Sequence, residues 1–160
     1  MYRGPVWSFE TTAGIVDPNL RVWYRLDEES GYTARDYSGR GYDAAIDTGY
    51  PDWDPKDGRF GGSLGFDNDT DVECPSGILS TIESAISVSV WLKDAWKGGG
   101  GTNWVFSIAE KNGSVVEAAV VEGSTEDVLW RAGDDSNDVL RWNLDGAETL
   151  EDWHHWVFVK

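Results

Sequence analysis

The chain has 160 residues and a formal net charge of −16, from 29 acidic and 13 basic side chains. This charge excludes nucleic acids and anionic membranes as favourable partners, because both repel a strongly negative surface. Hydrophobic residues make up 40% of the chain and aromatic residues 13%, so it can bury a sizeable core and is not disordered. The acidity otherwise fits solubility, a salty environment or divalent-cation sites.

The rest of the composition favours β structure. Nineteen Gly and ten Trp against a single Met argue against a helical bundle. The one cysteine, Cys74, allows no internal disulfide, and we interpret it as a small buried apolar residue. No signal peptide is visible after Met1, and no apolar run is long enough to insert into a membrane. We expect an extracellular or virion-surface location, reached without a signal in this chain.

Short apolar runs alternate with Gly, Asp, Asn and Ser turns along the whole chain, which predicts many short strands. The expected strands are residues 5–9, 20–26, 42–46, 63–66, 71–74, 86–93, 103–109, 114–121, 127–132, 138–144 and 153–160. Residues 86–93 give the clearest pattern, because apolar side chains at even positions alternate with Ser87, Ser89 and Trp91.

The breaks between these runs carry turn chemistry. Asn112-Gly113 between two apolar runs is a strong hairpin signal. Only residues 76–84 offer a short helix of one or two turns. Some ten short strands at this spacing predict an antiparallel sandwich, and no repeat or linker divides the chain.

Five segments in order resemble a known family. They are residues 23–31, residues 36–43 with Asp36-Tyr37-Ser38-Gly39, residues 58–67, residues 86–93, and Trp153-His154-His155-Trp156-Val157. From residue 20 to residue 160 the chain resembles the laminin G-like, concanavalin A-like lectin–glucanase jelly-roll domains. The resemblance implies an all-β, antiparallel two-sheet jelly-roll sandwich over residues 20–160, with residues 1–19 as an N-terminal strand or arm.

The same resemblance implies that the last strands of the sandwich are lacking. Domains of this family usually continue past the Trp-His-His strand into further strands. We therefore expect residues 153–160 to pair centrally in their sheet. The missing neighbours would lie in residues beyond Lys160 or in another subunit, so the chain would belong to a larger chain or assembly.

The sequence predicts no catalytic residues, and we expect a protein that is not an enzyme. The Glu-x-Asp-x-x-Glu signature of the glucanase relatives is absent, and the carboxylates of residues 148–152 precede the last strand in a turn. No Gly-x-Ser-x-Gly motif occurs. His154 and His155 are adjacent in a predicted strand, so they point to opposite faces and cannot serve one site.

An acidic loop is the candidate metal site. Asp67-Asn68-Asp69-Thr70-Asp71 resembles the opening of a calcium loop, although the sequence departs from the EF-hand pattern at its sixth and twelfth positions. Jelly-roll relatives often hold a structural Ca²⁺, so the resemblance implies ligands from Asp67 and Asn68, with Asp27 and Asp43 as partners. The alternative is that these residues only form turns. Residues 134–138 make a weaker second cluster.

Loop aromatics are the candidate ligand-binding residues, because sugars stack on flat aromatic faces while Asp and Asn bind hydroxyl groups. We place Trp53 in a polar loop, and Trp96 with Asn103 at a Gly-rich loop. The alternative is that each Trp covers the sandwich core. Two functions remain open. One is a non-catalytic module that binds glycans or cell surfaces. The other is a structural or decoration component of a virion or surface assembly, with protein subunits as partners.

Overall fold

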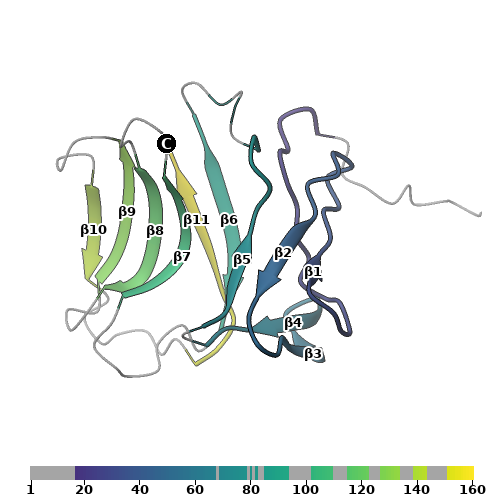
Figure 1. Ribbon diagram of the computed structural model, residues 1–160. Helices are drawn as coiled ribbons and strands as arrows, with labels where there is room; N and C mark the ends of the chain where they lie inside the picture. Colours follow the sequence, from purple (N-terminus) through teal and green to yellow (C-terminus); the bar gives the residue numbers. More distant parts are fainter. Residues whose placement is uncertain are drawn as a thin grey trace, which may run out of the picture. The chain divides into compact units, whose positions relative to one another are not determined.

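The computed structural model describes residues 17–67, 69–78, 80, 82, 85–93, 102–109, 115–122, 127–133, 139–143 and 151–160. In these residues the regular structure is entirely β, with antiparallel strands and no helix, so no described helix could cross a membrane (Figure 1). The strands belong to two compact units, Met1–Thr81 and Ile82–Lys160, which we call unit 1 and unit 2.

Unit 1 contains a three-stranded sheet and a two-stranded one. The first has the order β1-β2-β5, with bounds β1 Thr33–Ala34, β2 Ala44–Asp47 and β5 Asp71–Glu73. The second pairs β3 Asp52–Gly58 with β4 Gly61–Gly65. Ala44 and Ile46 are buried in β2 while Ala45 and Asp47 are exposed. This alternation is what a sheet with one buried face requires.

Unit 2 contains a four-stranded sheet and a two-stranded one. The first has the order β10-β9-β8-β7, with bounds β7 Thr102–Ala109, β8 Val115–Glu122, β9 Asp127–Gly133 and β10 Val139–Asn143. The second pairs β6 Ser87–Leu92 with β11 His154–Val159. Trp156 lies opposite Val90 and Phe158 opposite Val88, so these apolar residues share one face.

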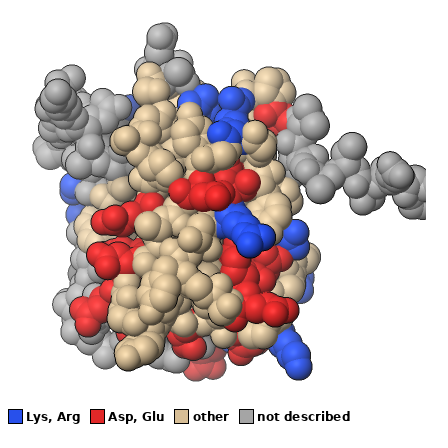
Figure 2. Space-filling model, turned by 45° about the vertical axis from the view of Figure 1, so that its right-hand side comes forward, with Lys and Arg blue, Asp and Glu red and all other residues tan. Residues whose placement is uncertain are grey.

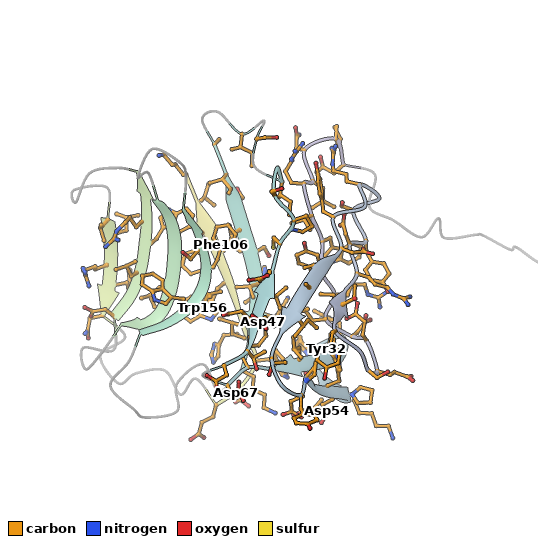
Figure 3. All side chains as sticks on the ribbon, in the orientation of Figure 1. Tyr32, Asp47, Asp54, Asp67, Phe106 and Trp156 are labelled. Atoms are coloured by element: carbon orange, nitrogen blue, oxygen red, sulfur yellow. The ribbon has the colours of Figure 1, made fainter. Side chains whose placement is uncertain are left out.

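The core of unit 2 is an aromatic cluster. Trp130 of β9 stacks on Phe158 of β11, with ring centroids 5.5 Å apart. Val128 completes the buried cluster, and Phe106 and Trp156, both labelled in Figure 3, pack against it. Leu129 points to the opposite face of β9 and is also fully buried, at 0% exposure. Strand β9 therefore buries both of its faces.

The structure confirms most of the expected strands and corrects three expectations. Residues 20–26 do not form a strand: Tyr24 makes only an isolated bridge to Asp36, and Leu26 has a left-handed φ of 54° that ends the extended run. Trp53 was expected in a polar loop, but it lies in the strand β3. The short β1 was also missed. Cys74, expected to be buried, is exposed.

The predicted helix, the first predicted strand and the pairing of the last strand have the following outcomes. The described residues of the 76–84 segment form turns or irregular chain and no helix. Residues 5–9 lie outside the described part of the chain. Among the described residues β11 pairs only with β6, so its expected second neighbour is not part of the described sheet.

A matched pair of leucines tests this core. We expect Leu129→Ala to lower the free energy of unfolding by about 2–5 kcal/mol, because it removes a fully buried side chain and leaves a cavity. Leu140→Ala, on the neighbouring strand β10, should cost less than about 1 kcal/mol, because Leu140 is 70% exposed. Urea denaturation followed by tryptophan fluorescence measures both. Equal losses would contradict the described core.

Candidate functional site

The carboxylate of Asp36 organises the connection between β1 and β2. Its Oδ1 accepts hydrogen bonds from the backbone N–H of Trp23 at 3.0 Å and of Ser38 at 2.8 Å. Its Oδ2 accepts from the Ser38 hydroxyl at 2.8 Å and from the Tyr42 N–H at 3.0 Å. The Asp36 N–H in turn donates to Asp43 Oδ1 at 2.8 Å. One side chain thus joins three backbone segments.

The electrostatics of Asp36 follow from these bonds. Partial burial by itself raises the pKa of this carboxyl, since it disfavours the charged form. The donors from Ser38, Tyr42 and Trp23 outweigh that effect, so the pKa lies below the ordinary value for Asp. Gly39 and Gly41 adopt φ of 83° and 78° in the same turn, a region that residues with a Cβ rarely occupy.

A strained loop lies between Arg25 and Glu28. Leu26 is the one described non-glycine residue with positive φ, and such a conformation persists only where its surroundings fix it. Here Arg25 pairs with Asp27 at 2.6 Å, and Glu28 Oε1 accepts the Arg35 N–H at 2.9 Å. Glu28 Oε2 is buried without a hydrogen-bond partner among the described residues. These contacts bring the loop beside β1.

The chain before β1 is joined to the β2–β3 connection and to β3 by the polar atoms of two aromatic side chains. The Tyr32 hydroxyl donates to the Gly49 carbonyl at 3.0 Å. The Trp53 indole N–H donates to the Gly31 carbonyl at 2.8 Å. Tyr50, next to Gly49, is 90% exposed, and Tyr32 is 53% exposed. We call Tyr32, Tyr50 and Trp53 the aromatic patch. Two of its three rings are fixed through their polar atoms, so their orientation is set before any ligand arrives.

Carboxylates alternate with these aromatic residues along the chain. Asp47, Asp52 and Asp54 belong to the same segment as Tyr50 and Trp53. Tyr32, Asp47 and Asp54 are labelled in Figure 3, where they come from the chain before β1, from β2 and from β3. Figure 2 shows acidic side chains in several clusters over the face that comes forward there. The aromatic patch therefore comes from a part of the chain that is rich in carboxylates.

These carboxylates differ in how the protein uses them. Asp54 Oδ1 accepts the N–H groups of Lys56 and Asp57, at 2.9 Å and 3.1 Å, and so shapes its own turn. Asp47 lies directly opposite Asp71 in the β2–β5 ladder, and both are exposed. Like charges facing each other across a strand pair are destabilising. The β2–β5 pair therefore brings two negative charges close together.

Unit 2 presents a different polar cluster on the exposed face of β6 and β11. His155 stacks on Trp91, with ring centroids 4.8 Å apart and an angle of 14° between the planes. Its Nε2 lies 2.8 Å from the Ser89 hydroxyl. All three side chains point away from the core cluster, because they alternate with Val90 and Trp156. The hydrogen bond and the stack both link the two strands.

Of the three residues predicted to bind a ligand, the structure describes the side chain of one. Trp53 lies in β3 rather than in a loop, is half-buried, and is part of the aromatic patch. Trp96 lies outside the described residues. Asn103 belongs to β7, and only its backbone is described. Binding by these three residues remains a prediction.

Three of the four predicted calcium ligands accept hydrogen bonds or form an ion pair within the protein. Asp67 Oδ1 accepts the Asp69 N–H and the Thr70 hydroxyl, at 3.0 Å and 2.6 Å, and these bonds lower the pKa of this exposed carboxyl, the Thr70 bond most. Asp27 pairs with Arg25, and Asp43 accepts the Asp36 N–H. Asn68 lies outside the described residues. In the described part of the chain, no three His, Cys, Asp or Glu residues form a group suited to a metal.

Comparison with protein-family models, curated proteins and solved structures finds no match for this chain. The resemblance to laminin G-like domains thus remains a prediction.

Sequence reasoning missed Tyr32 and Tyr50. A usable signal was the alternation of acidic and aromatic residues from Asp47 to Asp54, which was interpreted only around Trp53. Tyr32 carries no such signal, because only the bond to Gly49 brings it to this segment.

We expect Asp36→Ala to lower the free energy of unfolding of the protein by about 1–3 kcal/mol near neutral pH, because it leaves backbone donors without their acceptor. The pKa of Asp36 is depressed in the folded state, so its stabilisation is present above the ordinary Asp pKa. It is lost as pH falls through the folded value, and the gap to the variant should then narrow. Denaturation at a series of pH values measures this. A gap that widens in acid would contradict it.

Proposed function

We propose that this protein is a non-catalytic recognition module that binds glycans or cell surfaces, built on a laminin G-like jelly-roll sandwich. Its ligand surface is the aromatic patch of Tyr32, Tyr50 and Trp53. The all-β antiparallel architecture supports the sandwich, because a jelly roll needs strands of this kind and length.

The observation that carries the proposal is the anchoring of the patch. Tyr32 and Trp53 each place a polar atom on a backbone carbonyl, at 3.0 Å and 2.8 Å, and so hold their rings in fixed positions. Fixed aromatic rings reduce the entropy that a binding surface loses when a ligand is ordered on it. Tyr50 adds a ring that is 90% exposed. Asp47 and Asp52 supply carboxylate oxygens that accept hydrogen bonds from sugar hydroxyls.

The proposal assigns no reaction to the Ser89–His155 hydrogen bond. A nucleophilic serine needs a base and also donors that stabilise the developing oxyanion. Ser89 and His155 are both exposed on neighbouring strands, where backbone N–H groups lie in the plane of the sheet rather than toward its face. Their hydrogen bond is of the kind that links side chains across a strand pair.

A glycan array with single variants tests this function. We expect the intact protein to bind a subset of neutral glycans, and Tyr50→Ala to weaken binding about tenfold or more, because a stacking face is lost. Trp142→Ala is the matched control, since it removes another aromatic residue that is 72% exposed, in unit 2. Silence of the intact protein, or equal losses from both variants, would overturn the proposal.

One observation favours the alternative, a structural or decoration component of a virion or surface assembly. Leu140 and Trp142 of β10 lie opposite Trp130 and Val128 of β9, so they share the face that forms the core. They are nevertheless 70% and 72% exposed. Among the described strands β10 is also an edge of its sheet. An apolar edge strand of this kind pairs readily with another chain.

The alternative predicts self-association through β10. Under it, the protein sediments as an oligomer at micromolar concentration. Replacing Leu140 and Trp142 together with Ser should restore the monomer, because apolar surface is removed without touching the buried residues of β9. Sedimentation velocity measures the mass. A monomer that sediments alike with and without these substitutions would contradict the alternative and leave the glycan proposal standing.

A further inference from the structure

We propose that the aromatic patch selects glycans that carry protonated amino groups over neutral glycans, and excludes acidic ones. The inference rests on the proposed function, because it names the ligand class of the same surface. It follows from the charge around the patch and from the chemistry of its rings.

Two carboxylates near Tyr50 in the sequence have no hydrogen-bond or ion-pair partner among the residues that the structure describes. Asp47 and Asp52 lie three residues before and two residues after Tyr50. Neither carboxylate makes a hydrogen bond or ion pair with another described residue, in contrast to Asp27, Asp36 and Asp54. Two exposed acceptors therefore flank, in the sequence, the most exposed residue of the patch.

Asp47 and Asp71 form a pair of like charges. Asp47 faces Asp71 directly across β2 and β5, an arrangement that weakens the sheet unless a positive charge lies nearby. A ligand ammonium group placed near Asp47 would relieve this repulsion as it binds. An acidic sugar would add a further negative charge beside the pair, in a chain whose net charge is already −16.

The aromatic rings of the patch can attract a cation as well as a sugar. Tyr and Trp faces attract cations through the quadrupole of the π system, in addition to stacking on the apolar faces of sugars. Tyr50 is exposed enough to do both at once. A surface with fixed aromatic rings and free carboxylates therefore recognises a sugar ring and its ammonium group together, which a neutral glycan satisfies only in part.

The test compares three probes of equal length by calorimetry: chitosan oligosaccharides, fully N-acetylated chitin oligosaccharides, and oligogalacturonates. We expect the chitosan probe to bind about tenfold more tightly than the chitin probe, and the oligogalacturonate not to bind. The preference should shrink to near equality at about 1 M NaCl, because salt screens exposed charges. It should also vanish when pH is raised until the amines lose their protons.

Matched variants locate the effect. Asp47→Asn combined with Asp52→Asn should abolish the preference for chitosan, so that chitosan and chitin bind with about equal affinity, because the substitutions remove the charge that attracts ammonium groups. Glu151→Gln combined with Asp152→Asn changes the net charge equally in an exposed segment of unit 2 and should leave the preference intact.

The outcomes separate the two proposals. Binding of chitin and chitosan with equal affinity, or tight binding of the oligogalacturonate, overturns this inference and leaves glycan recognition in place. A preference that survives in the Asp47→Asn, Asp52→Asn variant overturns it as well. Failure of all glycans to bind, on the array and in calorimetry alike, overturns the proposed function and this inference with it.

Discussion

The hydrogen bonds of the Asp36 carboxylate are the constraint on which unit 1 depends. They hold Trp23, Ser38 and Tyr42 around one charged group, in a segment that would otherwise be a long connection without regular structure. Charge-assisted bonds to backbone N–H groups are stronger than neutral ones. They hold residues 20–26 in place, as backbone hydrogen bonds between paired strands do in a sheet. This explains how residues 20–26 are held without forming a strand.

The candidate site depends on this constraint through strand register. The Asp36 turn closes the connection between β1 and β2, which sets Thr33 opposite Ala45. That register places Tyr32 beside Ile46, where its carbonyl accepts the Ile46 N–H at 3.0 Å. The Tyr32 hydroxyl then reaches Gly49, two residues past the end of β2. A shift of one residue would turn Tyr32 to the other face and break its hydrogen bond to Gly49.

Unit 2 depends on packing rather than on a charged group. Trp130 and Phe158 form its centre, and Leu129 is buried on the other side of the same strand. The apolar face continues to the edge strand β10, where Leu140 and Trp142 stay exposed. The glycan proposal and the assembly alternative thus rest on residues of different units.

The sequence alone determined the all-β class and the position of most strands, because period-two alternation and turn residues act locally. It also singled out Trp53 as a candidate ligand-binding residue, and the structure makes it part of the aromatic patch. It did not predict β3, because the Pro and Asp residues of this segment are typical of loops. It also did not predict the φ of 54° at Leu26, which no local pattern indicates. Only the tertiary structure joined Tyr32 to Gly49 and set Asp47 opposite Asp71, because such pairs arise from register between distant segments, which a linear pattern does not encode.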